Sequence, residues 1–176
     1  MRHELKEPFT KDKLKDLRAG DTVLLTGTIY AARDAAHKRL VGMIEEGQEL
    51  PVEIKDQIIY YAGPTPARPG HPIGSAGPTT SYRMDSFTPQ LLKLGLSGMI
   101  GKGPRNDEVK QAAAECGAVY FAAIGGAAAL ISQSIKEAEV VAFAEMGTEA
   151  IRRLYVEDLP LIVAYDAEGG DVFARG

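Results

Sequence analysis

The feature that most constrains the fold is a regular alternation of apolar, β-branched segments with helical segments in the second half of the chain. Apolar strands separated by helices of this length are typical of parallel strands joined by crossover helices. The alternation therefore predicts a single α/β domain with a mixed sheet over residues 1–176. In order, the predicted elements are helix 88–94, strand 97–100, helix 107–116, strand 118–123, helix 126–135 and strand 139–144.

The first half of the chain and its tail extend this pattern. In the tail, the apolar run 161–165 is followed by a Gly-containing turn and by Val172 and Phe173, which predicts a β-hairpin. Segments rich in β-branched residues predict strands, and segments with apolar residues on one side predict helices. By these criteria the first half contains helix 11–17, strand 22–30, helix 33–46 and strand 58–61.

Residues 62–83 break the pattern because they concentrate Gly, Pro, Ser and Thr. Such a composition excludes a regular helix or a central strand. The segment is either a flexible linker or a long functional loop. A linker should lead to a second domain, whereas both flanks look like parts of one α/β unit, so we interpret the segment as a functional loop.

Composition excludes several classes of protein. Apolar residues make up 45% and charged residues 25% of the chain, which is enough apolar material for a core and unlike a disordered tail. The net charge of -4 argues against a basic surface for nucleic acid. A single cysteine, Cys116, excludes an internal disulfide and a cluster held by several cysteines of this chain. The N-terminal residues lack a signal-peptide core and no apolar run could span a bilayer, so we expect a cytoplasmic protein.

The glycines around Lys102 invite a nucleotide-binding interpretation, which the spacing does not support. Gly101-Lys102-Gly103 lies between a predicted strand and a predicted helix, where phosphate is often bound. A Walker A motif needs Ser or Thr after the lysine, and a dinucleotide fingerprint from Gly101 needs Gly in place of Asn106. What remains is either a tight turn with a solvated lysine or a turn that presents a cation beside backbone N–H groups.

Two further clusters carry candidate chemistry. The segment 77–85 places hydroxyls, Arg83 and Asp85 just before a helix, either as helix caps or as a site for a small anion whose carboxylate Arg83 binds bidentately. Arg33 stands at the start of a predicted helix, where a cation opposes the helix dipole. One hypothesis is that Arg33, Arg83 and Lys102 converge at one edge of the sheet and form a pocket for a dicarboxylate.

Three motifs together resemble one family. Gly-Thr-Ile-Tyr-Ala-Ala-Arg-Asp-Ala-Ala-His-Lys-Arg at 27–39, Gly-Pro-Thr-Thr-Ser-Tyr-Arg-Met-Asp at 77–85 and Gly-Lys-Gly at 101–103 are similar to class I fumarate hydratase. The similarity is to its β subunit, which is equivalent to the C-terminal domain of the single-chain enzymes. The small subunit of L(+)-tartrate dehydratase belongs to the same family. Residues 125–130 and 145–151 fit the same pattern.

The resemblance implies a swivelling β/β/α fold and a heteromeric hydro-lyase with an oxygen-sensitive [4Fe-4S] cluster, whose ligands come from a cluster-bearing α subunit. It implies that Thr79 handles the carbon-bound proton and that Arg33, Arg83 and Lys102 hold the dicarboxylate. A lone hydroxyl is a weak base near neutral pH, so Thr79 needs a carboxylate partner. The resemblance places that carboxylate on the cluster-bearing subunit, and Asp85 is the alternative within this chain.

Several alternatives stay open at the level of sequence. The substrate is either fumarate or tartrate, because the groups that distinguish them are expected to lie partly on the other subunit. Asp34 and His37 also belong to the first motif, and we expect supporting roles for them. A non-catalytic carboxylate-binding module with the same fold is the rival class of function, since a fold does not fix a function.

Overall fold

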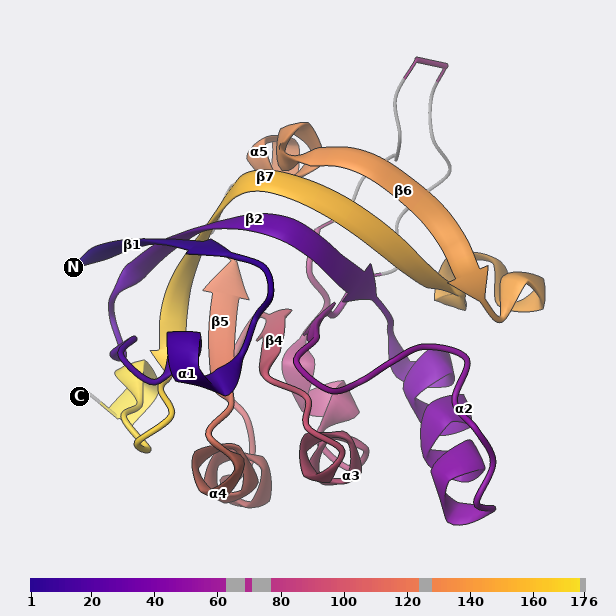
Figure 1. Cartoon of the computed structure of the whole chain (residues 1–176), viewed down its shortest axis with the longest axis horizontal. Helices are drawn as coiled ribbons and strands as arrows, with labels where there is room; N and C mark the ends of the chain where they lie inside the picture. The colour runs from indigo at the N-terminus through magenta and orange to yellow at the C-terminus, as the bar shows by residue number, and fades with distance from the viewer. Residues whose placement is uncertain (63–68, 71–76, 124–127, 175–176) are drawn as a thin grey trace.

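The computed structural model describes residues 1–62, 69–70, 77–123 and 128–174, and its main feature is a sheet that closes on itself. Seven strands follow the order β1-β2-β3-β4-β5-β7-β6, and an additional pairing of β2 with β7 closes β2, β3, β4, β5 and β7 into a barrel (Figure 1). The strands are β1 Arg2–Lys6, β2 Thr22–Ala31, β3 Ile58–Tyr60, β4 Gly98–Gly101, β5 Val119–Ala123, β6 Ile135–Ala142 and β7 Ile151–Tyr165.

Strands β1 to β5 run parallel to their neighbours, and β7 is antiparallel to β2, β5 and β6. The predicted α/β class with a mixed sheet is therefore confirmed, whereas closure into a barrel was not predicted. The long β7 makes the closure possible because one of its edges pairs with β2 over residues 152–162, while the other pairs first with β6 and then with β5. Its first half lies between β2 and β6, and its last residues reach β5.

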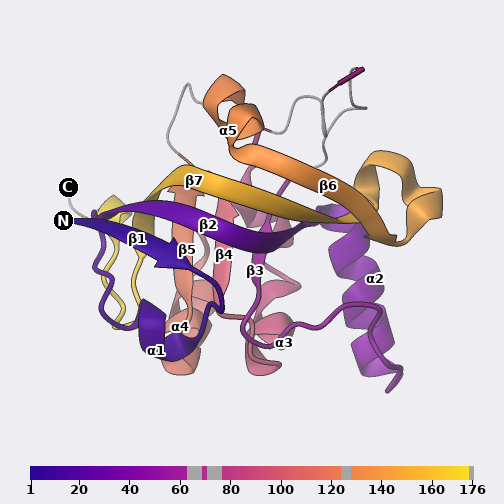
Figure 2. The ribbon, with the colours of Figure 1, turned by 45° about the horizontal axis from the view of Figure 1, so that its top comes forward.

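Helices flank the barrel (Figure 1, Figure 2). The helices α2, α3 and α4 lie together below the barrel in the view of Figure 1, and α5 lies on the opposite side. The α-helices are α1 Lys11–Leu14, α2 Asp34–Glu45, α3 Thr88–Lys93, α4 Asp107–Cys116 and α5 Ala128–Ser134. Short 3₁₀ segments, labelled η, are η1 Ser81–Met84, η2 Ala144–Glu149 and η3 Val172–Ala174.

Two apolar clusters hold these layers together. The first fills the barrel with side chains such as Leu25, Phe121 and Leu161. The second packs the outside of the sheet against α2, α3 and α4, and it includes Leu40 and Leu91. Alternate residues of β2 are buried, as expected for a strand with one face toward a core.

The predicted hairpin in the tail is wrong. Residues 161–165 are the end of β7, and Val172–Ala174 is a 3₁₀ segment linked to β7 by a single bridge from Asp171 to Tyr165. The part of β7 before residue 161 was not predicted, because Glu157, Asp158 and Pro160 interrupt the apolar pattern of the strand. A bulge explains how the strand continues: Asp158 has φ of 50° and its N–H donates to the Thr26 hydroxyl, where the register with β2 shifts.

Most other boundaries agree with the prediction to within a few residues. The helix predicted at 107–116 is confirmed as α4, with Asn106 accepting a hydrogen bond from the Val109 N–H at its start. Two differences stand out: β1 was not predicted, and β6 begins at Ile135, four residues before the predicted strand. Residues 63–68 and 71–76 of the predicted loop, and 124–127 with the Gly-Gly pair, lie outside the described residues.

Candidate functional site

The candidate site lies where the parallel strands β2, β3 and β4 end. Beyond the strands the ladder continues, because the Ala32 N–H donates to Tyr60 O at 3.0 Å and the Tyr61 N–H donates to Ile100 O at 2.8 Å. Carboxyl ends of parallel strands meet at one edge of a sheet, where open backbone groups and loops form binding sites. The loops that carry the predicted site residues therefore lie at the edge formed by the carboxyl ends of β2, β3 and β4.

The segment 79–81 lies between the ends of β3 and β4. The Thr79 N–H donates to Tyr61 O at 2.7 Å, and the Ser81 N–H donates to Lys102 O at 3.0 Å. Thr80 and Lys102 also form a parallel bridge. The backbone thus sets Thr79, which is partly buried, beside the Gly-Lys-Gly turn with its exposed Lys102.

The same edge brings Arg33 and Arg83 together through Asp34. Arg33 is the N-cap of α2 and Asp34 is the first residue of that helix. The Nε of Arg83, in η1, donates to Asp34 Oδ2 at 2.8 Å. On its other side, Arg33 Nε lies 3.7 Å from Glu149 Oε1, which comes from η2. Contacts therefore connect the ends of β2, β3 and β4 through the predicted site residues.

A buried hydroxyl network fixes the Gly-Lys-Gly turn. Because Tyr120 OH donates to Gly103 O at 2.8 Å, the Ser81 hydroxyl is the donor in its 2.6 Å bond to the Tyr120 oxygen. Burial raises the pKa of Tyr120, so the phenol keeps the proton it donates. Gly101 is required by this packing, since a Cβ there would lie 1.9 Å from Ser81 Oγ.

Beneath the turn lies Arg105, a residue that sequence reasoning missed. Its side chain is 0% exposed, and its Nε donates to Asp85 Oδ1 at 2.6 Å. Its Nη2 donates to the hydroxyls of Tyr61 at 3.1 Å and Thr88 at 2.8 Å, and the guanidinium lies over the rings of Tyr61 and Tyr120. No signal in the sequence marks a buried arginine just before α4, because Arg105 has the setting of an ordinary helix-flanking cation.

Asp85, predicted as the alternative base, is part of this buried network. Its Oδ1 accepts from Arg105, and its Oδ2 accepts from the Asn106 N–H at 2.9 Å. The residue is 6% exposed. Both oxygens are thus engaged in holding the start of α4 and the segment before it.

His37 is buried next to the site. Its Nδ1 lies 2.7 Å from Arg33 O, which can only accept, so the proton is on Nδ1 and Nε2 carries the lone pair. Burial lowers the pKa of His37 to about 4, so the imidazole is neutral at pH 7. Its ring makes edge contact with Tyr61 at a centroid distance of 5.4 Å. The hydrogen bond from His37 Nδ1 therefore helps to fix the backbone of Arg33.

Unpartnered polar atoms gather around Arg33. In the described part of the chain, the buried side-chain atoms without a hydrogen-bond partner are Arg33 Nε, Asp34 Oδ1, His37 Nε2 and Glu149 Oε2. Buried polar groups in folded proteins are nearly always hydrogen-bonded. A concentration of unpaired atoms on neighbouring residues therefore marks a place where further polar groups are expected to bind.

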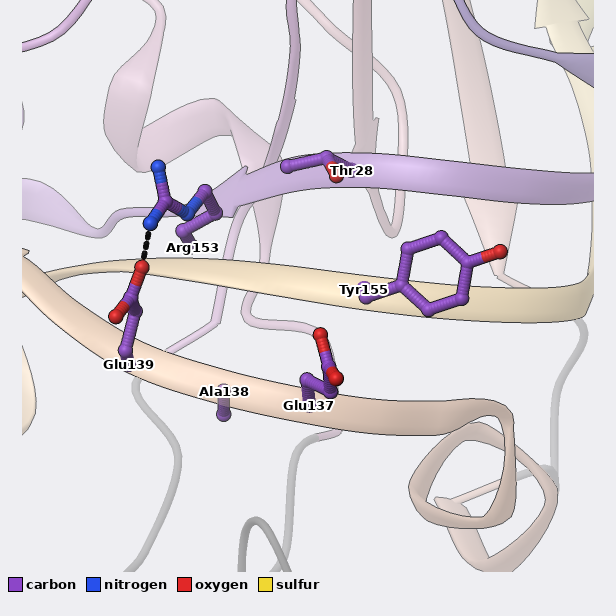
Figure 3. A pocket seen from close by; sticks show the side chains of 6 residues that line it. All are labelled: Thr28, Glu137, Ala138, Glu139, Arg153 and Tyr155. Atoms are coloured by element: carbon purple, nitrogen blue, oxygen red, sulfur yellow. Dashed lines mark ion pairs between the residues drawn. The ribbon is translucent and has the colours of Figure 1, made fainter.

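A hollow lies on the outer face of β2, β7 and β6, and none of the predicted site residues lines it (Figure 3). An ion pair between Glu139 and Arg153 bridges β6 and β7 at its side. This pair neutralises the arginine of the hollow, and Glu137 leaves its lining with one net negative charge. It is lined by Thr28, Glu137, Ala138, Glu139, Arg153 and Tyr155.

Among residues 1–62, 69–70, 77–123 and 128–174, no three His, Cys, Asp or Glu side chains are placed to hold a metal ion. Cys116 is a free, half-buried thiol at the end of α4. Over the same residues, no helix has the length and hydrophobicity needed to cross a bilayer.

Comparisons with known proteins identify the family. The family model described as Fumarase C-terminus matches residues 1–176. "Fumarate hydratase class I, anaerobic" of Escherichia coli (strain K12) is 48% identical over 153 residues, which cover 86% of this chain and 28% of that protein. "Fumarate hydratase 2" of Leishmania major is 38% identical over 176 residues, which cover 98% of this chain and 31% of that protein.

A shorter relative matches over most of its own length. "Putative L(+)-tartrate dehydratase subunit beta" of Methanocaldococcus jannaschii is 39% identical over 171 residues, which cover 94% of this chain and 88% of that protein. The chain thus spans less than a third of the two fumarate hydratases and nearly the whole of the beta subunit. Because the family model covers all residues, the chain belongs to the Fumarase C-terminus family, the C-terminal or β-subunit region of class I fumarate hydratases.

Proposed function

We propose that this chain is the β subunit of a heteromeric hydro-lyase that reversibly hydrates fumarate to malate. The family supports the reaction, and the similarity to a protein named as a dehydratase subunit beta supports a subunit of a heteromer. A partner subunit would then supply the rest of the active site. The described residues do not form a ligand set for the [4Fe-4S] cluster that the resemblance implies, and the proposal assigns that cluster to the partner.

The observation that carries the proposal is the set of unpartnered buried atoms beside the two arginines. Arg33 Nε, Asp34 Oδ1 and Glu149 Oε2 all lie at the edge where β2 ends, and each lacks a hydrogen-bond partner among the described residues. Unpaired buried atoms cost free energy, of the order of 1–3 kcal/mol each. A structure that keeps several together is best explained by a site that a substrate and a second subunit complete.

Arg33, Arg83 and Lys102 are the proposed dicarboxylate-binding residues. The guanidinium group offers two parallel N–H donors that match a carboxylate, and the lysine ammonium adds a further positive charge. Asp34 and Glu149 leave a net charge of +1 on these five side chains (three cations against two carboxylates). A substrate with two carboxylates is attracted to such a site, and a neutral molecule is not.

Thr79 is the proposed proton-transfer residue of this chain. In the hydration, hydroxide bonds to one alkene carbon and a proton bonds to the neighbouring carbon, and Thr79 Oγ would pass that proton. We assign Asp85 no proton transfer, because Arg105 and the Asn106 N–H already donate to its two oxygens. We therefore propose that Asp85 is a positioning residue and that the carboxylate which assists Thr79 belongs to the partner subunit.

The second candidate is the β subunit of an L(+)-tartrate dehydratase. It is favoured by one observation, that the relative of matching length carries that name. The two reactions share the addition or loss of water next to a carboxylate, and their hydroxy-acid substrates, malate and L(+)-tartrate, differ in one hydroxyl group. The same arginines and Lys102 would hold either substrate.

The decisive experiment is to purify the tagged chain from its native lysate without oxygen and to assay hydration of fumarate and dehydration of L(+)-tartrate. A brown complex that hydrates fumarate supports the proposal. A brown complex that acts only on tartrate supports the second candidate. A colourless chain without a partner or activity would contradict both and favour a carboxylate-binding module.

Substitutions at Thr79 test its role within the active complex. Thr79→Ala removes the hydroxyl and should reduce turnover by at least about a hundredfold, as expected for loss of a general acid or base. Thr79→Ser keeps the hydroxyl and should retain measurable turnover. Equal activity of the two variants would remove Thr79 from the mechanism.

A further inference from the structure

The segment η2 carries a carboxylate that the proposed mechanism does not use. The motif at 145–151 belongs to this turn between β6 and β7, which lies beside the N-terminal end of α2 (Figure 1). Glu149 Oε1 lies 3.7 Å from Arg33 Nε, and the two side chains are 27% and 26% exposed. Glu149 is thus half-buried against the residue that we propose as a substrate ligand.

The contact repeats a pattern seen at the other proposed arginine. Arg83 presents its Nε to Asp34 Oδ2 at 2.8 Å, just as Arg33 presents its Nε to Glu149. Neither arginine donates a hydrogen bond from its Nη atoms to the described residues. A carboxylate of this chain therefore faces the Nε edge of each guanidinium, hydrogen-bonded to Arg83 and at ion-pair distance from Arg33, and the Nη1–Nη2 edge is left for another group.

This arrangement has a physical advantage for binding a dicarboxylate. An arginine side chain loses considerable rotamer freedom when it is fixed in one orientation. A carboxylate that holds the Nε edge before the substrate arrives removes part of that cost from the binding step. The held orientation also determines which of the donors face the substrate.

Resting on the proposed function, we propose that Glu149 and Asp34 are positioning residues that aim the Nη1–Nη2 edges of Arg33 and Arg83 at the two carboxylates of the substrate. They act through the arginines and make no contact with the reacting atoms. The substrate carboxylates are bound before and during the reaction. Loss of either positioning residue therefore weakens binding more than it slows the chemical step.

The turn η2 offers a matched control. Its Glu145 forms a separate ion pair with Arg39 of α2, with Oε1 3.3 Å from Arg39 Nη1, and Arg39 also lies over the ring of Phe143. Glu145→Gln removes one ion pair between η2 and α2, as Glu149→Gln does. It leaves Arg33 and its carboxylate unchanged, so it reports on the docking of η2 alone.

The experiment measures fumarate hydration by the assembled hydratase carrying Glu149→Gln, Asp34→Asn or Glu145→Gln. We expect about a tenfold increase in KM with kcat within about threefold for the first two, and both constants within about twofold for Glu145→Gln. Glu149→Asp, which keeps the charge, should recover part of the KM. Unchanged KM in both positioning variants would overturn the inference, and so would an equal effect of Glu145→Gln.

Calorimetric titration of the same complexes with succinate, a saturated dicarboxylate, supplies a second readout. Affinity should fall about tenfold in Glu149→Gln and Asp34→Asn and stay constant in Glu145→Gln. A wild-type complex that lacks hydration activity would refute the proposed function, and the titration would still test the positioning. Equal succinate affinity in all four complexes would overturn the inference.

Discussion

Arg105 and Arg83 lie close in the sequence, at neighbouring edges of the same fold, and their surroundings differ sharply. Arg105 is fully buried, and its guanidinium has an acceptor or an aromatic ring on every side: Asp85, two hydroxyls, Met99 Sδ and two tyrosine rings. Arg83 is 44% exposed, and its single partner among the described residues is Asp34. Arg33 resembles Arg83 in this respect.

The difference separates a structural arginine, Arg105, from the two arginines that we propose as substrate ligands. A buried guanidinium whose three nitrogens all donate to neighbouring side chains leaves little for a ligand, and its contribution is to join α3, β4 and the start of α4. An arginine that contacts a carboxylate only through Nε still has its two Nη groups available to bind another carboxylate. Donor occupancy, rather than residue type or position near a motif, therefore distinguishes the two roles in this chain.

Of the substitutions considered, Arg105→Met in the buried network should reduce the free energy of unfolding the most. The substitution keeps most of the side-chain volume and leaves the Asp85 carboxylate buried without its cation, so we expect a loss of about 3–5 kcal/mol in the free energy of unfolding. Urea unfolding followed by circular dichroism measures the loss. Adding Asp85→Asn should restore part of the stability. A loss below about 1 kcal/mol would show that the network is dispensable.

His37 gives the next largest effect, and it depends on pH. Its pKa of about 4 in the folded chain lies below the ordinary value of 6.5, so the unfolded chain takes up a proton first as the pH falls. Stability is therefore lost between about pH 6.5 and 4, by at most about 3 kcal/mol from this group. Unfolding curves at several pH values should show a shallower decline for His37→Gln than for the wild type. Parallel declines would contradict the assignment.

Gly101→Ala tests how tightly the turn that carries Lys102 is packed. A Cβ at Gly101 would lie 1.9 Å from Ser81 Oγ and 2.8 Å from Tyr61 Cδ2, so we expect a loss of about 1–3 kcal/mol. Gly42→Ala in α2 is the control, because nothing lies within 4 Å of that position and alanine should stabilise the helix by roughly 0.5–1 kcal/mol. A neutral Gly101→Ala would mean that the turn can shift.

The sequence predicted the elements of the barrel better than its closure. Apolar runs such as 118–123 are continuous, and they marked buried strands without ambiguity. β7 was missed over its first half because Glu157, Asp158 and Pro160 interrupt its pattern, and a bulge that only the pairing with β2 can stabilise resolves that interruption. Local pattern cannot report a long-range pairing.

The sequence motifs predicted four site residues that lie at the edge of the sheet where β2, β3 and β4 end: Arg33, Thr79, Arg83 and Lys102. They did not reveal the contacts that assign roles. Asp85 looked like a candidate base beside Arg83, and its oxygens are used by residues twenty positions away. Arg105 carried no local signal, and the motif at 145–151 contains Glu149 without indicating that it faces Arg33, because both contacts exist only in the folded chain.

Arg83→Ala should have the smallest effect on stability, which would distinguish the exposed Arg83 from the buried Arg105. Its ion pair with Asp34 is partly solvated, and exposed pairs contribute less than about 1 kcal/mol. Turnover of the assembled complex should nevertheless fall at least about a hundredfold, because two charge-assisted hydrogen bonds to the substrate are lost. Unfolding and activity are measured side by side for Arg83→Ala and Arg105→Met. Of the two variants, Arg105→Met should show the larger loss in the free energy of unfolding. If Arg83→Ala kept near-normal turnover, the free fork of Arg83 would have no role in binding the dicarboxylate.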